Sequence, residues 1–279
     1  MRALVEIKGG FGNQLFQLAF ANHLKHLGFK VTLNLEKNNN KSMAINYEHF
    51  GFKRSNILLI KITRFLYRIS QGNKGKYFFR LLFSKFFDKK SKMEQFDDNN
   101  KKYLTHFDGY WQDVKILEEQ KKYLISCLSK SENFETPLDK NTIPGSTLVH
   151  VRKGDYKSVN EDLHITYFQE AIDYAKKHID NFSFEVFTDD IEWVNNQKIF
   201  SEAKYIHSPN QTQASILIDV SKMLNFENYI ISNSSFSLTA AILGEKKNSI
   251  VILPTPWMKH TKADPKNLKY AWKKIKNQF

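Results

Sequence analysis

The chain has 279 residues, 41% of them hydrophobic, which excludes a disordered polymer and favours two globular domains over one. The 42 Lys and Arg residues outnumber the 29 Asp and Glu residues, and the formal net charge of +13 favours an anionic partner without identifying it. The single cysteine, Cys127, excludes an intrachain disulfide and a cysteine zinc cluster. With no apolar run long enough for a signal peptide or a membrane span, we expect a cytoplasmic protein.

The first 35 residues predict half of a doubly wound α/β sheet. Residues 3–7 have the pattern of a buried strand and 8–14 of a glycine-rich loop. Residues 15–27 are apolar almost all round, which predicts a buried helix that ends at Gly28. Residues 31–35 predict a second strand.

The loop between the first strand and the helix allows three interpretations. A dinucleotide site would require a third glycine where Leu15 stands, although Glu36 lies where such a site needs an acid. A tight turn would need only a positive φ at Gly9 or Gly10. In the third interpretation, backbone N–H groups and Asn13 approach a diphosphate or a sugar.

Residues 57–90 are basic and aromatic. One interpretation is a pair of helices whose aromatic faces close the core of the first domain, with cations in solvent. Another is a surface that contacts anionic lipid headgroups or an acidic acceptor. Nucleic-acid binding is a third, but no recognisable motif supports it, so we expect no nucleic-acid partner.

The composition of residues 131–146, with two prolines and a glycine, predicts a linker between domains. We therefore predict an N-terminal Rossmann-like domain over 1–140 and a C-terminal one over 141–260. The remaining residues, 261–279, are predicted to contain a helix that packs back across the domains.

The stretch 148–156 is the first candidate for an active centre. It begins as a buried strand and ends in two cations, a glycine and a carboxylate. Because side chains alternate along a strand, His150 and Arg152 should share a face. Gly154 would let the chain turn, and Asp155 would then orient Arg152 or a substrate hydroxyl. Ligands of open α/β sheets bind beyond the carboxyl ends of the strands, where this stretch is predicted to lie.

Two acids, Asp189 and Asp190, follow the predicted strand 184–187. They could bind a metal, favour the N-terminus of the next helix, or accept hydrogen bonds from a purine or ribose. Because no histidine or third acid stands nearby at ligand spacing, we expect no metal.

The serine-rich segment 232–237 follows the predicted strand 229–231 and opens a helix. Free N–H groups, the positive end of the helix dipole and serine hydroxyls would converge there on an anion. Alternatively, the serines only cap the helix.

Five blocks, in this order, resemble the bacterial α-1,2-fucosyltransferases of glycosyltransferase family 11. They are GGFGNQLFQ at 9–17, GYWQ at 109–112, HVRKGDY at 150–156, FTDD at 187–190 and ISNSSFS at 231–237. Two departures stand out: Lys153 replaces a second arginine, and Leu238 and Thr239 replace paired tryptophans. The resemblance implies a GT-B fold, in which two Rossmann-like domains face a central cleft.

The resemblance also implies an activity. It is inverting, metal-independent transfer of L-fucose from GDP-fucose to the 2-hydroxyl of a galactose-like acceptor, with no cofactor. The acceptor would be a galactose-terminated oligosaccharide, free or lipid-linked, for a surface polysaccharide such as the lipopolysaccharide O-antigen. The 57–90 surface would then contact the inner face of the plasma membrane. Alternatives are transfer of a related deoxy sugar from GDP, or a basic non-catalytic module that binds membrane or nucleic acid.

Roles for individual residues follow from the resemblance as expectations. Catalysis is assigned to His150, Arg152 and Asp155, with Arg152 at the β-phosphate and Asp155 as candidate base. The donor-binding set adds residues from both predicted domains: Gly10, Gly12, Asn13, Gln14, Asp189, Asp190, Asn233, Ser234, Ser235 and Phe236.

Overall fold

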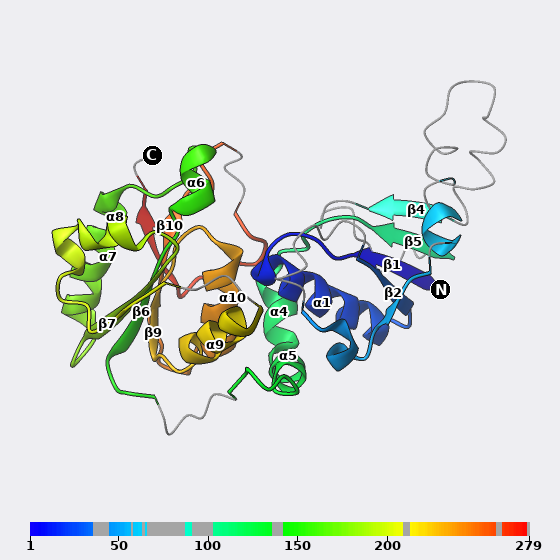
Figure 1. Cartoon of the computed structure of the whole chain (residues 1–279), viewed down its shortest axis with the longest axis horizontal. Helices are drawn as coiled ribbons and strands as arrows, with labels where there is room; N and C mark the ends of the chain where they lie inside the picture. The colour runs from blue at the N-terminus through cyan, green and yellow to red at the C-terminus, as the bar shows by residue number, and fades with distance from the viewer. Residues whose placement is uncertain are drawn as a thin grey trace. The chain divides into compact units, whose positions relative to one another are not determined.

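The computed structural model describes residues 1–35, 45–56, 58–62, 65, 87–90, 103–135, 142–208, 213–260 and 264–277. The chain divides into two compact units, Met1–Cys127 and Leu128–Phe279. Each unit contains one parallel β-sheet with helices packed against it (Figure 1). The predicted α/β class, with the two Rossmann-like domains that a GT-B fold requires, is thereby confirmed. The cleft between the domains stays a prediction.

The N-terminal unit has a five-stranded sheet in the order β3-β2-β1-β5-β4, with every pair parallel. Four of the five residues of β1 are buried, as expected for a central strand covered on both faces. The strands are β1 Arg2–Glu6, β2 Lys30–Asn34, β3 Lys53–Arg54, β4 Phe87–Lys90 and β5 Leu104–Phe107. The helices are α1 Phe11–His26, the 3₁₀ helix η2 Tyr47–Phe50, α4 Val114–Glu119 and α5 Lys121–Leu128.

Helix α1 begins at Phe11, so the loop that precedes it is shorter than predicted. The prediction started the helix at Leu15 because glycine and asparagine are weak helix formers, but burial of the first turn outweighs that preference. Gly9 makes the turn, with φ of 80°, which confirms the interpretation that a positive φ is needed there. An added Cβ at Gly9 would stand 2.9 Å from Asn13 Nδ2, so the close approach of this side chain also requires glycine.

The C-terminal unit has a six-stranded parallel sheet in the order β11-β10-β9-β6-β7-β8. The strands are β6 Ser146–Val151, β7 Ser183–Thr188, β8 Ile206–His207, β9 Asn228–Ile230, β10 Val251–Thr255 and β11 Lys273–Lys276. The helices are α6 Gly154–Ser158, α7 Ile165–His178, α8 Ile191–Asn195, η6 Lys198–Phe200, α9 Gln213–Met223 and α10 Ser235–Gly244.

Helices cover both faces of this second sheet. Helices α7 and α8 lie on one face and α9 and α10 on the other (Figure 1). All six residues of β6 are buried, which is the pattern of a strand between two helical layers. Helix α7 turns Tyr167, Phe168 and Ala171 onto Val149 and Val151 of β6. The last turns of α10 are buried on every side, which matches their apolar sequence.

The helix predicted within 261–279 is wrong, because residues 273–276 form the edge strand β11 beside β10. Within this strand only Ile275 is buried, at 6% exposed, while all three lysines are exposed. Three lysines around one isoleucine suit an edge strand, where charge discourages pairing with a second molecule.

Most of the segment 57–90 lies outside the described residues, as does 136–141 within the predicted linker. Residues 58–62 are helical, whereas Phe87–Lys90, at the end of the region interpreted as two helices, form strand β4. The division between the units falls at Cys127 and Leu128, before the predicted boundary at 140. Within the described ranges, no helix is long and apolar enough to cross a bilayer.

Candidate active site

The strand order of the C-terminal unit creates a switch point between β6 and β9. From β6 the chain runs through α7 to β7 on one side, whereas β9 pairs with the other side of β6. Connections therefore diverge at the carboxyl ends of these two strands. Ligands of open parallel sheets bind in the crevice that such a divergence leaves. The stretch 150–156 and the serine-rich segment 232–237 both follow these strand ends.

A short hydrogen bond joins the two strand ends. His150 Nδ1 lies 2.6 Å from Ser232 Oγ, and both side chains are buried. Burial, followed by the positive charge of Arg152, lowers the pKa of His150 to about 3. The imidazole is therefore neutral at physiological pH. It can accept or donate a hydrogen bond there but does not supply a positive charge.

Arg152 is held along its Nε edge by two carboxylates, Asp155 and Asp189. Nε and Nη2 lie 2.9 and 2.8 Å from Asp155 Oδ1, and Nε lies 3.2 Å from Asp189 Oδ2. The side chain of Asp189 is 8% exposed, whereas that of Asp155 is 65% exposed. The predicted orientation of Arg152 by Asp155 is thus present, and one third of the Arg152 side chain faces solvent.

Gly154 is needed for contact with Asp189 rather than for the turn that the sequence suggested. The residue opens the short helix α6, and an added Cβ would stand 2.6 Å from Asp189 Oδ2. The other oxygen of Asp189 accepts the backbone N–H of Lys153 at 2.8 Å. Only glycine lets the carboxylate reach both this N–H group and Arg152.

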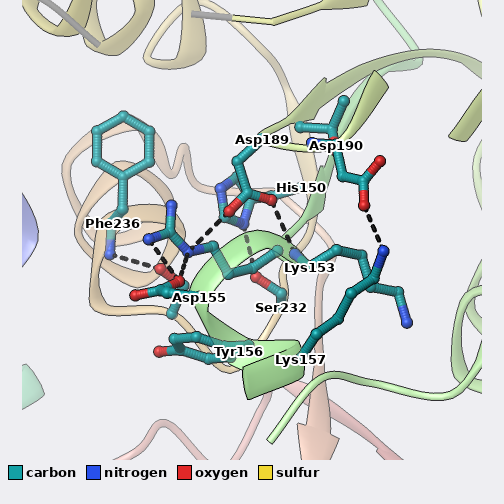
Figure 2. A network of polar contacts seen from close by, with 12 residues as sticks. His150, Lys153, Asp155, Tyr156, Lys157, Asp189, Asp190, Ser232 and Phe236 are labelled. Carbon is teal, nitrogen blue, oxygen red and sulfur yellow. Dashed lines mark hydrogen bonds and ion pairs between the residues drawn. The ribbon is translucent and has the colours of Figure 1, made fainter. Parts of the chain in front are cut away.

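Asp190 has a different environment from Asp189. Its side chain accepts the N–H of Trp193 at 2.9 Å and caps helix α8, which confirms the interpretation of a helix N-terminus. Its other oxygen pairs with Lys157 Nζ at 2.5 Å (Figure 2). The hydrogen bond from Lys157, followed by that from Trp193, lowers the pKa of Asp190.

The serine-rich segment forms the start of α10. Ser234 is the N-cap and its Oγ accepts the N–H of Phe236 at 3.3 Å. Ser237 turns inward and donates to the carbonyl of Ser232 at 3.3 Å. The serine-rich segment therefore does cap the helix. It begins where the carboxyl ends of β9 and β6 lie side by side. The ring of Phe236 lies 5.8 Å from that of His150.

Asn233 and Tyr156 tie the serine segment to α6. Tyr156 donates its hydroxyl to Asn233 O at 3.1 Å, and Asn233 Nδ2 donates to Glu161 O at 2.8 Å. Asn233 is 1% exposed, and within the described part of the chain its Oδ1 has no hydrogen-bond partner. A buried acceptor without a donor is costly, and it is a natural contact for a ligand hydroxyl or amide.

Lys153, the departure from the family pattern, points away from Arg152. Its Nζ donates to Asp162 Oδ2 at 2.8 Å and to Leu163 O at 2.6 Å, and lies 4.1 Å from the centre of the Trp193 ring. The ammonium group of a lysine at this buried position therefore has hydrogen-bond partners. Lys153 and Trp193 also line a cavity of about 320 Å³ beside the site.

The predicted donor residues of the N-terminal unit lie at the turn into α1. Gly10 is the N-cap, and Gly12 is buried in the first turn of α1. Asn13 Oδ1 accepts from Gln112 Nε2 at 2.7 Å. Gln14 is 1% exposed and bonded at both ends, donating to Gly9 O at 2.9 Å and accepting from the N–H of Ile45 at 3.0 Å. In this structure Gln14 thus holds the turn together.

Sequence reasoning assigned no role to Tyr156 or Glu161, and it treated Ser232 only as part of the serine-rich segment rather than as a partner of His150. The Glu161 carboxylate is buried and accepts the N–H groups of Lys259 and His260 at 2.6 and 3.0 Å. A lone acid in a polar loop gives no sequence signal for this. Among the described residues, no cluster of three or more His, Cys, Asp or Glu side chains is placed to hold a metal ion.

Nearly the whole chain matches one protein family. The model of the family described as "Glycosyl transferase family 11" matches residues 3–276. The chain belongs to glycosyl transferase family 11. The predicted family is therefore confirmed, and the protein is a glycosyltransferase.

Two curated relatives from Escherichia coli are similar over most of their length. The chain is 30% identical over 276 residues to an alpha-1,2-colitosyltransferase, covering 91% of each protein. It is 23% identical over 282 residues to the O-antigen biosynthesis glycosyltransferase WbnK, covering 90% of this chain and 93% of that protein.

Two solved structures resemble this family 11 glycosyltransferase more distantly. The alpha-1,6-fucosyltransferase NodZ, soaked with GDP-fucose, has a TM-score of 0.42 at 15% identity, over 87% of this chain and 92% of NodZ. The E. coli heptosyltransferase WaaC, with ADP-2-deoxy-2-fluoro heptose, has a TM-score of 0.42 at 12% identity, over 99% and 93%.

Proposed function

We propose that this family 11 glycosyltransferase moves L-fucose from GDP-fucose to the 2-hydroxyl of a galactose-like residue, with inversion at the anomeric carbon. One observation carries the proposal. Arg152, anchored by Asp155 and Asp189, stands at the switch point that His150 and Ser232 tie to the serine-capped start of α10. A cation and a helix N-terminus at one strand edge suit a nucleoside diphosphate.

In the proposed reaction, the acceptor oxygen forms a bond to the anomeric carbon while the bond from that carbon to the β-phosphate oxygen breaks. The electron pair of the broken bond leaves with GDP, and the acceptor proton passes to a base or to water. Negative charge grows on the leaving diphosphate and positive charge on the sugar ring. Groups that meet the diphosphate therefore stabilise the transition state more than the ground state.

Arg152 would meet the leaving diphosphate with its Nη edge, because its Nε edge is held by Asp155 and Asp189. The backbone N–H group of Ser235 and the positive end of α10 would add to it. Asp189, Asp190 and the buried Asn233 Oδ1 are candidates for the guanosine contacts. Neutral His150 would support the nucleotide through hydrogen bonding. Together these groups make a divalent cation unnecessary in the proposed mechanism.

Asp155 is the candidate base, and its geometry gives it a second role. Both of its bonds from Arg152 end on Oδ1, so the carboxylate orients the guanidinium through one oxygen. Because the diphosphate of the donor would meet the Nη edge, Asp155 would stay on the guanidinium when the donor binds. We therefore assign Asp155 primarily to positioning Arg152.

A second candidate donor is a GDP-activated dideoxy sugar related to fucose. The observation that favours it is the 30% identity to a colitosyltransferase, over 91% of both chains. The similarity to WbnK favours an O-antigen oligosaccharide as acceptor. A lipid-linked acceptor would bring the enzyme to the inner face of the plasma membrane, with 57–90 as the proposed contact.

Thermal unfolding with nucleotides tests the donor class. GDP should raise the melting temperature more than UDP, ADP or NAD; preference for NAD would instead support an oxidoreductase. A screen of GDP-fucose and GDP-linked dideoxy sugars against galactosides, read by mass spectrometry, then separates the two donors. Strongly salt-dependent binding to DNA or anionic vesicles, with no transfer from any GDP-sugar, would support the non-catalytic module.

A further inference from the structure

The C-terminal unit contains a second cavity, of about 360 Å³, that the proposed mechanism does not use. Ser146, the first residue of β6, lines it, whereas the candidate active site follows Val151 at the other end of that strand. Five steps along a strand separate these residues by roughly 16 Å. Its other sheet residues come from β7 and β8, on the side of β6 away from β9, and none of the candidate active-site residues lines it. The cavity is therefore distinct from the crevice at the switch point.

Aromatic rings form the floor of this cavity. Glu185 of β7 lines it, and Phe187 lies on the same face of that strand, because the alternate residues Phe184 and Val186 point to the helix α7 side. The His207 ring stacks on Phe187 with centroids 4.3 Å apart. Phe226 meets Phe187 edge to face at 6.0 Å.

One wall of the cavity offers a flat ring to solvent. Tyr205 is 65% exposed, and its ring centroid lies 6.3 Å from that of His207. A ring of this size left open to water is a surface on which an apolar ligand face can stack.

Polar groups of both hydrogen-bonding kinds surround this floor. Asn225 donates Nδ2 to Ser221 O at 3.2 Å, but its Oδ1 is buried and has no hydrogen-bond partner among the described residues. Glu185 Oε2 pairs with His207 Nε2 at 2.7 Å, which leaves its second oxygen to accept. Lys222 supplies a donor at the rim. The ligand must therefore donate hydrogen bonds to Asn225 and Glu185 and accept one from Lys222.

We propose that this cavity binds one pyranose ring of a neutral oligosaccharide. A pyranose has an apolar C–H face that can stack on Tyr205, and hydroxyl groups that donate and accept at its rim. Glu185 beside Lys222 disfavours a strongly charged ligand of either sign. The volume falls in the range of small-molecule sites, about 300–1,000 Å³.

The inference builds on the proposed function, because the acceptor of that reaction is an oligosaccharide. A remote sugar of the acceptor would occupy the cavity while its terminal galactose reaches the donor. Two linked contacts raise the effective concentration of the second, so the enzyme would favour long acceptors over single sugars.

Saturation-transfer NMR on the full-length protein, with GDP present, tests binding directly. Methyl β-D-galactoside is the probe, and we expect Tyr205→Ala and Asn225→Leu each to remove about half of the signal. Tyr270→Ala, a fully exposed tyrosine of the same unit, is the matched control and should leave it unchanged. Because a variant can misfold, melting temperatures are compared first, and Tyr205→Trp should retain the signal.

Kinetics provide the second measurement. Tyr205→Ala should raise KM for an oligosaccharide acceptor at least about fivefold, while kcat and KM for methyl β-D-galactoside stay unchanged. Unchanged NMR signals in both Tyr205→Ala and Asn225→Leu would overturn the proposal, as would displacement of the Tyr205-dependent signal by guanosine. Failure of GDP to bind the wild-type protein would count against the proposed function instead, so the two failures are distinguishable.

Discussion

His150 at the end of β6 and Ser232 just after β9 are joined by a 2.6 Å contact between Nδ1 and Oγ, although 82 positions separate them in sequence. This contact fixes the spacing of the two strand ends from which Arg152 and the serine-capped helix begin. The imidazole stays neutral because burial and the neighbouring guanidinium lower its pKa to about 3. Its hydrogen bond therefore links the strand end that carries Arg152 to the one that leads into α10, both of which are proposed to meet the same diphosphate.

Replacing Arg152 by alanine should lower kcat by about 10²–10³-fold, because the leaving diphosphate loses its main counter-charge. Arg152→Lys should be intermediate, since an ammonium keeps the charge but not the fork of donors. The matched control is Lys176→Ala, which removes the same charge from a surface pair with Glu202. Near-normal turnover in Arg152→Ala, measured with radiolabelled donor, would contradict the central assignment.

Asp155→Asn separates a base from a positioning residue. We expect kcat to fall less than tenfold and KM for the donor to rise, because Asp155 orients the guanidinium of Arg152 that would meet the diphosphate. A general base would instead contribute about 10²–10⁴-fold to kcat. A kcat loss in that range with unchanged GDP affinity, measured by calorimetry, would identify Asp155 as the base.

Gly154→Ala should weaken GDP binding at least about tenfold, because its Cβ would stand 2.6 Å from Asp189 Oδ2 and push the carboxylate from Arg152. The same substitution in an Asp189→Ala background removes the clash and should cost far less. The coupling between the two substitutions, measured by GDP titration of all four proteins, tests this contact. Additive effects would show that Gly154 acts independently of Asp189.

The buried imidazole of His150 predicts a pH-dependent stability. The folded state holds this group neutral down to about pH 3, whereas the unfolded chain protonates it near the ordinary histidine pKa of 6.5. Stability from this group is therefore complete above pH 6.5 and decreases as the pH falls from 6.5 towards 3. At pH 5 we expect a loss of about 2 kcal/mol relative to pH 7.5.

Urea unfolding of wild type and His150→Asn at the two pH values measures this loss, which the variant should lack. His26→Asn, at an exposed histidine of the other unit, is the control and should keep it. Equal pH dependence in wild type and His150→Asn would show that the imidazole is not the cause.

Metal removal should leave transfer intact, because Arg152 and the N–H groups at the start of α10 are proposed to carry the diphosphate charge. Dialysis against EDTA followed by an activity assay measures this. The matched comparison adds back Mn²⁺ or Mg²⁺ to the same sample. A strict requirement for either ion would refute the metal-free mechanism.

Sequence patterns predicted the parallel sheets well, because buried strands and amphipathic helices have clear periodicities. The prediction of a helix in the C-terminal segment was wrong because Ile275 is the only apolar residue among three lysines. One apolar residue does not distinguish an edge strand from a helix face. The predicted start of α1 was wrong because the burial of Phe11 and Gly12 outweighed the weak helix propensity of the glycine-rich segment.

The candidate site was predicted where its residues were neighbours in sequence, as with Arg152 and Asp155. The contacts of Arg152 with Asp189, and of Asn233 with Glu161, depend on which strands lie side by side. Strand order is a property of the folded sheet, so no local pattern could assign these pairs.

The lysine-rich strand β11 changes how the charge of the chain should be interpreted. A formal net charge of +13 suggests a surface that attracts anions, but Lys273, Lys274 and Lys276 stand on the open edge of a sheet. Cations there discourage other strands from docking, which is a matter of colloidal behaviour rather than of substrate binding. Part of the positive charge thus serves to prevent self-association. Neutralising these lysines should promote aggregation without altering GDP affinity.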